Sequence, residues 1–200
     1  MSLTKQSKTL TTQQINTMSS YLRSKRNGLR NQTIFFLSVY SGLRSKEISQ
    51  LSWKEVLNSN GEVSDTINLT NQTSKGSNGG RIIPIHSKLK QNLIELHKII
   101  KQKPYYNPNT SFIIYTERLP FTTSQCIVNM FQKWYKSLNY IGCSSHSGRR
   151  TFITNTSKKI SLVGGSLRDI QYLSGHSSLQ TTQKYIEGDS KSRTKVVNLL

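Results

Sequence analysis

The chain has 200 residues, of which 34% are hydrophobic, enough to bury the core of one domain. Lysine and arginine number 28 against 9 aspartate and glutamate residues, so the formal net charge is +19. The excess runs along the whole chain and indicates a polyanionic partner, most commonly nucleic acid, with a basic structural protein as the alternative on charge alone.

The cysteine content and the apolar runs exclude several other classes. The two cysteines, Cys126 and Cys143, form no disulfide framework and no zinc-binding pattern. No apolar run approaches the roughly 20 residues of a membrane span, and the N-terminus lacks the apolar core of a signal peptide. We therefore expect a soluble cytoplasmic protein with reduced thiols and no membrane contact.

The first third of the chain predicts an arm followed by helices. Residues 1–11 are polar and lysine-bearing, which is typical of a flexible arm. Thr11 offers an N-cap for a helix that ends at the Asn27-Gly28 pair. A second apolar helix covers residues 29–40, and a short amphipathic helix follows it.

The middle of the chain changes to strands and then returns to helices. Residues 63–69 and 81–85 predict two strands joined by a glycine-rich turn, and Pro84 places the second strand at a sheet edge or at its own end. Helical periodicity then resumes at Leu89, Leu93, Leu96 and Ile100 and again at Ile127, Phe131, Trp134 and Leu138.

The last sixty residues predict three short helices, at about 146–160, 166–173 and from Leu179 onward. The expected fold class is therefore α+β, mostly α-helical, with a small antiparallel sheet. One domain would cover residues 12–190 and a tail would cover residues 191–200.

The side chains that could act on a phosphodiester are mostly cations. The few scattered carboxylates argue against a two-metal nuclease site. Four phrases instead contain basic residues and one tyrosine: SGLRSKEISQLSW (41–53), TSKGSNGGRIIPI (73–85), SHSGRRTFIT (145–154) and LSGHSSLQTTQKYI (173–186). The candidate residues in them are Arg44, Lys75, His146, Arg149, His176 and Tyr185.

In their order, spacing and surrounding phrases, these residues resemble the catalytic domain of the tyrosine recombinase (phage integrase) family, from about residue 10 to 190. The resemblance implies a nucleophilic attack by Tyr185 that leaves a 3′-phosphotyrosine and a free 5′ hydroxyl. Arg44 and Arg149 would clamp the non-bridging phosphate oxygens, because a guanidinium pairs with two oxygens and stays charged. His176 would donate to a phosphate oxygen.

The resemblance also implies the proton transfers. His146 would take the proton of the tyrosine, and Lys75, on its mobile hairpin, would protonate the departing 5′ oxygen. The phosphotyrosine retains the bond energy for rejoining, so the reaction needs no cofactor and no metal, which agrees with the absence of a P-loop. Glu47 would support the Arg44 region by a hydrogen bond.

Other residues receive simpler interpretations. Arg81, Arg150 and Lys184 are predicted to contact the DNA backbone without reading bases. Trp53, Phe131 and Trp134 are predicted core residues. Gly148, at a position where many relatives have a bulkier apolar residue, is expected to loosen local packing.

The sequence thus predicts a site-specific recombinase acting on double-stranded DNA. A homo-oligomer, most simply a tetramer, is expected on DNA, with accessory DNA-bending proteins as further partners. Two alternatives stay open at this point: a type IB topoisomerase, and a DNA-binding regulator that keeps the fold but does not cut.

The resemblance is incomplete at the N-terminal side, because the first motif begins at residue 42. Most relatives have a core-binding domain of about a hundred residues before it. A stand-alone catalytic domain similar to the short fimbrial-switch recombinases and a fragment of a longer integrase are both consistent with this. The apolar residues near position 200 could anchor the tail on a neighbouring protomer, with a frayed terminus as the alternative.

Overall fold

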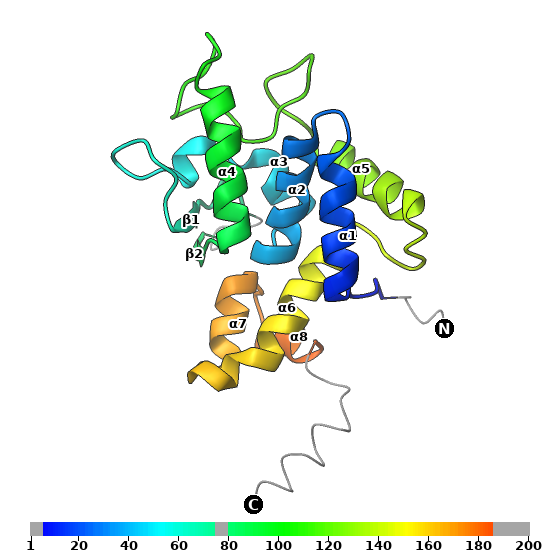
Figure 1. Ribbon diagram of the computed structural model, residues 1–200. Helices are drawn as coiled ribbons and strands as arrows, with labels where there is room; N and C mark the ends of the chain where they lie inside the picture. The colour runs from blue at the N-terminus through cyan, green and yellow to red at the C-terminus, as the bar shows by residue number, and fades with distance from the viewer. Residues whose placement is uncertain (1–5, 75–79, 186–200) are drawn as a thin grey trace, which may run out of the picture.

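The computed structural model describes residues 6–74 and 80–185, and helices make up most of it. Figure 1 shows a body formed by the first five helices and the hairpin, with α6, α7 and α8 gathered below it. The elements are α1 (Thr12–Arg23), α2 (Gly28–Ser41), α3 (Ser45–Gln50), the 3-10 turn η1 (Trp53–Glu55), β1 (Thr66–Leu69), β2 (Arg81–Pro84), α4 (Ser87–Ile100), α5 (Ser124–Ser137), α6 (Ser147–Lys159), the 3-10 turn η2 (Ile160–Val163), α7 (Leu167–Ser174) and α8 (Leu179–Gln183). The predicted α+β class is confirmed.

The helix boundaries follow local capping chemistry. Thr11 accepts a hydrogen bond from the backbone N–H of Gln14, whose side chain in turn accepts from the Thr11 N–H, which confirms the predicted N-cap. Gly42 ends α2 in the left-handed conformation, with φ of +65°. Gly175 ends α7 in the same way, with φ of +61°.

The two strands form one antiparallel sheet, in which Ile67 pairs with Ile83 and Leu69 pairs with Arg81. The first strand is shorter than predicted, because Val63 forms an isolated bridge with Leu57 and the ladder begins only at Thr66. The predicted turn over residues 76–80 lies outside the described residues except for Gly80.

A hydrophobic core holds the body together. It extends from Leu10 to Tyr135 and includes the three predicted aromatic residues Trp53, Phe131 and Trp134. Trp53 and Phe131 are completely buried. The described helices contain no segment long and apolar enough to cross a membrane.

Residues 7–10 are docked on the body, so the expectation of a flexible arm is wrong for them. The Lys8 N–H donates to the Gly142 carbonyl at 3.0 Å, and the N–H of buried Leu10 donates to the Thr151 hydroxyl at 2.8 Å. Polarity alone suggested an arm, but these backbone groups find partners more than 130 residues away.

Gly148 also differs from its expectation, because it permits close packing of α6 on α2. A Cβ at position 148 would lie 2.9 Å from the Cβ of Ser38 and 3.3 Å from its carbonyl carbon. A residue without a side chain therefore brings α6 against α2. The first turn of α6 carries the candidate residue Arg149, and the candidate His146 directly precedes the helix.

Candidate active site

Arg149 lies on the first turns of α6 and is 5% exposed. Its guanidinium donates to the carbonyl of Gly42 at 2.6 Å and to that of Ser174 at 2.7 Å. Burial, together with the nearby charge of Arg44, lowers its pKa to about 10, so the group stays charged at neutral pH. Arg149 thus joins α2, α6 and α7 and brings a positive charge to the point where they meet.

Arg44 precedes α3 and lies close to Arg149. Its side chain donates to Glu47 at 3.0 Å and to the carbonyl of Gly175 at 3.1 Å, and 27% of that side chain is exposed. The carboxylate of Glu47 also accepts from the Arg44 backbone N–H at 2.8 Å. The predicted support of Arg44 by Glu47 is confirmed, and Arg44 keeps an accessible face.

His176 follows the end of α7 and is 8% exposed. Its Nδ1 lies 2.9 Å from the hydroxyl of Thr182, and its ring stacks on that of Tyr185 with centroids 5.6 Å apart. Burial, and then the charges of Arg149, Arg44 and Arg81, lower its pKa to about 4. The imidazole is therefore neutral at physiological pH and acts as a hydrogen-bonding group.

His146 is the residue directly before α6. Burial of its ring is the main cause that lowers the pKa of His146 below the ordinary value. The positive charges of Arg149 and Arg44 lower this pKa further. A neutral imidazole has one nitrogen free to accept a proton, so His146 has the protonation state that a general base requires.

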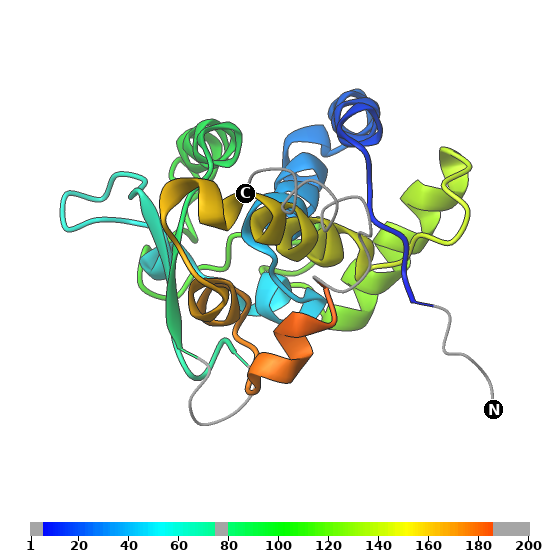
Figure 2. The same ribbon diagram turned by 90° about the horizontal axis from the view of Figure 1, so that it is seen from below.

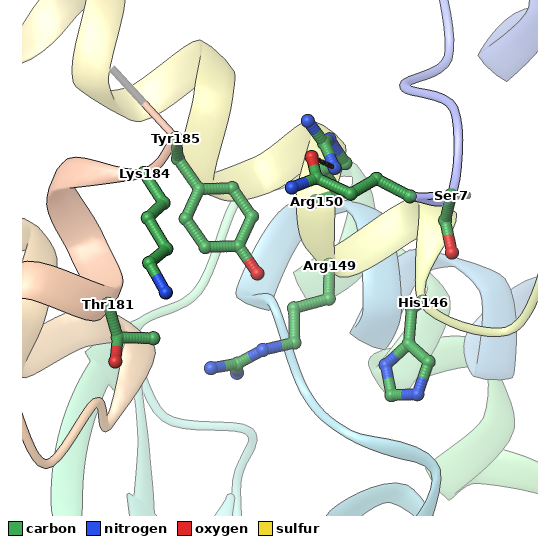
Figure 3. A pocket seen from close by; sticks show the side chains of 8 residues that line it. Ser7, His146, Arg149, Arg150, Thr181, Lys184 and Tyr185 are labelled. Carbon is green, nitrogen blue, oxygen red and sulfur yellow. Dashed lines mark hydrogen bonds between the residues drawn. The ribbon is translucent and has the colours of Figure 1, made fainter. Parts of the chain in front are cut away.

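Tyr185 lies in the turn after α8, where its N–H donates to the Thr182 carbonyl at 3.0 Å. Figure 3 shows its phenol pointing toward Arg149, with His146 beyond that arginine. A pocket of about 330 Å³ contains these side chains. The residues lining it are Gln6, Ser7, His146, Arg149, Arg150, Thr181, Lys184 and Tyr185.

The two predicted backbone contacts Arg150 and Lys184 also line this pocket. The Arg150 guanidinium lies over the Tyr185 ring, 5.6 Å from its centroid, and donates to the side-chain oxygen of Gln6. Lys184 is exposed beside the nucleophile candidate. Both positions suit a contact with an anion that enters the pocket, and both roles stay predictions.

Arg81 is not placed as predicted, because its side chain is only 2% exposed and cannot lie on a DNA backbone. It donates to Glu47 at 2.9 Å and to the Leu173 carbonyl at 3.0 Å. An arginine next to a glycine-rich turn looked like a surface charge, whereas Arg81 is an internal ion-pair partner.

Five of the six predicted site residues therefore come together, and Lys75 lies outside the described residues. Sequence reasoning missed Gln6 and Ser7, which reach the pocket from a segment with no motif, and Thr182, which holds His176. Among residues 6–74 and 80–185, no three His, Cys, Asp or Glu side chains cluster as metal ligands would.

The arrangement can hold a phosphate diester against a phenol. Two arginines present charge to its non-bridging oxygens, a neutral histidine can donate to it, and a second can accept the proton of the phenol. No step of such a transfer requires a carboxylate, and the carboxylate closest to the arginines, Glu47, is buried and paired.

The comparisons with known proteins agree on one family. Residues 8–192 match the model of the phage integrase family. Over 169 residues, the chain is 27% identical to the tyrosine recombinase XerC of Haemophilus ducreyi. The matched region makes up 84% of this chain and 51% of that protein. The chain thus spans about half the length of this relative.

Solved structures share the fold at low sequence identity. The Tn1549 transposon integrase in complex with circular intermediate DNA matches with a TM-score of 0.75 and 20% identity over 98% of this chain and 65% of that one. The XerA recombinase matches with a TM-score of 0.74 and 19% identity, over 96% and 64% of the two chains.

Proposed function

The chain belongs to the phage integrase family, and from that premise we propose that it is the catalytic domain of a site-specific DNA recombinase. The substrate is double-stranded DNA, and the reaction is cleavage and rejoining through a 3′-phosphotyrosine at Tyr185. The observation that carries this proposal is the pocket that combines Tyr185 with His146 and Arg149.

In the cleavage step, the phenolic oxygen of Tyr185 attacks the phosphorus of the scissile diester. The new bond joins that oxygen to phosphorus, and the bond from phosphorus to the 5′ oxygen breaks. His146 accepts the phenolic proton, which its lowered pKa allows at neutral pH. By family resemblance, Lys75 gives a proton to the 5′ oxygen as it leaves.

Charge stabilisation falls to the arginines and His176. Arg44 and Arg149 face the non-bridging oxygens, where negative charge develops, and they need little reorganisation because carbonyl oxygens and Glu47 already hold them. His176 donates from Nε2 when its Nδ1 accepts from the Thr182 hydroxyl. Rejoining is the reverse step with a 5′ hydroxyl of another strand.

Arg150 and Lys184 contact neighbouring phosphates and position the duplex. A complete exchange between two duplexes cuts four strands, and each active site cuts one, so we propose a homotetramer on DNA. Accessory proteins that bend the DNA help to bring the sites together. The reaction takes place in the cytoplasm, on the DNA of the host cell.

The test uses nicked suicide substrates built from the DNA that flanks the gene. Wild type is expected to form a covalent, protease-sensitive adduct in the presence of EDTA, and Tyr185→Phe is expected to bind the same DNA without forming it. An adduct that persists in Tyr185→Phe contradicts the assignment of the nucleophile. Binding without any adduct in wild type contradicts the recombinase proposal.

A further inference from the structure

Three arginines converge on the last turn of α7. They come from separate segments of the chain and donate to three consecutive carbonyl oxygens. The pairs are Arg81 with Leu173 (3.0 Å), Arg149 with Ser174 (2.7 Å) and Arg44 with Gly175 (3.1 Å). The residue that follows is His176, so this contact fixes the point from which its side chain projects.

Two of these arginines share one buried carboxylate. Glu47 is 1% exposed and accepts from Arg44 at 3.0 Å and from Arg81 at 2.9 and 3.2 Å. Burial opposes the ionisation of Glu47, yet the hydrogen bonds and charge of Arg81, together with Arg44, hold its pKa below the usual range. The carboxylate is thus ionised at neutral pH, and Arg81 is its fully buried partner.

The strand that begins with Arg81 touches α7 at a second point. The backbone N–H of Ile82 donates to the hydroxyl of Tyr172 at 3.1 Å. At Gly175, an added Cβ would lie 2.9 Å from the guanidinium carbon of Arg81. Figure 2 shows α7 between β2 on one side and α8 on the other. The position of α7 therefore depends on β2, and the position of His176 depends on α7.

We propose that Arg81 is a positioning residue of this active site, which neutralises Glu47 and braces the end of α7 so that Arg44 and His176 face the phosphate. Without Arg81, the buried carboxylate would draw the guanidinium of Arg44 fully onto itself. The accessible face of Arg44 would then be lost, and His176 would lose the brace before it. The inference rests on the proposed function, because it assigns a role within that reaction.

The first measurement separates this role from a DNA contact. Each phosphate contact contributes about 0.9 to the slope of log affinity against log salt concentration. Arg81→Lys, whose charge keeps Glu47 paired and leaves Arg44 at the phosphate, is expected to keep the wild-type slope and to bind within about threefold of wild type. The control variant Lys184→Gln, at a proposed phosphate contact, is expected to reduce the magnitude of the slope by about 0.9.

The second measurement is the single-turnover rate of adduct formation at saturating DNA. Arg81→Gln is expected to slow it about 100-fold. Arg81→Lys, which keeps the charge but has no planar fork, is expected to slow it about tenfold. Adding Glu47→Gln to Arg81→Gln removes the uncompensated carboxylate and is expected to recover part of the loss, since contacting residues do not act additively.

Circular dichroism melting accompanies each variant. If Arg81→Gln does not fold, Arg81→Lys decides the question, because its retained charge keeps Glu47 paired. A wild-type rate for Arg81→Lys, or a lowered salt slope with an unchanged saturating rate, overturns the inference while wild-type adduct formation still supports the recombinase. Absence of any wild-type adduct removes both proposals.

Discussion

Two regions of this protein are held together by different forces. From Leu10 to Tyr135, aliphatic and aromatic side chains form one continuous hydrophobic core. Among the described residues after position 144, the buried hydrophobic side chains are Ile153 and Ile170. The buried groups in that region are mostly polar: Ser147, Arg149, Thr151, Ser174, His176 and Thr182.

This difference in buried groups suggests that the first region mainly contributes stability, whereas the second mainly positions the groups of the proposed active site. The first region gains stability from apolar burial, which is nondirectional and tolerates small shifts. The second region, the described residues after position 144, holds most of the proposed active site and is called the catalytic region below. It depends on directional hydrogen bonds between guanidinium groups and helix-end carbonyls, and these hold charged groups in a fixed geometry. Substitutions in the two regions should therefore have different effects on unfolding and on cleavage.

The largest effect on stability is expected in the hydrophobic region, from Phe131→Ala. Phe131 is completely buried and packs on Trp134 and Tyr135, with ring centroids 5.4 and 5.9 Å away. The free energy of unfolding should fall by about 3–5 kcal/mol, while the folded fraction keeps its cleavage rate. Denaturant titration measures the free energy of unfolding. The cleavage rate per folded molecule is obtained by dividing the observed rate by the concentration of active sites. Phe121→Ala, at an exposed ring, is the control and should change neither.

The next effect concerns pH and belongs to the catalytic region. His176 has a folded-state pKa of about 4, against an unfolded value of about 6.5. Between these two pH values, His176 is therefore protonated in the unfolded chain but not in the folded chain. Stability is full above about pH 6.5 and decreases as the pH falls toward 4. The loss from this residue between pH 7 and pH 4.5 should be about 2–3 kcal/mol.

Denaturant titrations of wild type and His176→Gln across this range measure the contribution, because the variant lacks the titrating group. The two stability curves should converge or cross as the pH falls. Parallel curves would mean that His176 has the same pKa in the folded protein as in the unfolded chain, and the lowered pKa assigned to it would be withdrawn.

A smaller effect is expected where the two regions meet, at Gly148→Ala. The added methyl would lie 2.9 Å from the Cβ of Ser38, so α6 must move away from α2. Unfolding free energy should fall by about 1–3 kcal/mol. Because Arg149 moves with α6, the cleavage rate at saturating DNA should fall as well, which distinguishes this variant from Phe131→Ala. An unchanged rate would show that catalysis tolerates a shift of α6.

The smallest effect is expected at Gln6→Ala, which tests whether the N-terminal segment belongs to the catalytic region. Gln6 accepts from Arg150, and Arg150 lies over the Tyr185 ring. Stability should change by less than about 0.5 kcal/mol, since the contact is exposed. The cleavage rate should fall by up to about fivefold, which corresponds to about 1 kcal/mol, the value for a single ordinary hydrogen bond. Gln13→Ala, at an exposed position on α1, is the control.

Much of the fold could be predicted because its signals are local. Thr11 caps a helix through contacts three residues away, and the spacing of Leu89, Leu93 and Leu96 repeats with the helical turn. The short length of β1 could not be predicted in this way, since its pairing depends on a strand that begins twelve residues after β1 ends.

The sequence by itself determined which residues could form the site, because the order and phrases around Arg44, His146, Arg149, His176 and Tyr185 can be recognised without coordinates. Only the tertiary structure decided how they are held. The inward position of Arg81, the close approach at Gly148 and the docking of Leu10 depend on partners distant in sequence. The protonation state of His176 follows from burial and from three arginines that the fold brings to it. Periodicity and spacing describe a residue's neighbours along the chain, whereas burial and charge depend on neighbours in space.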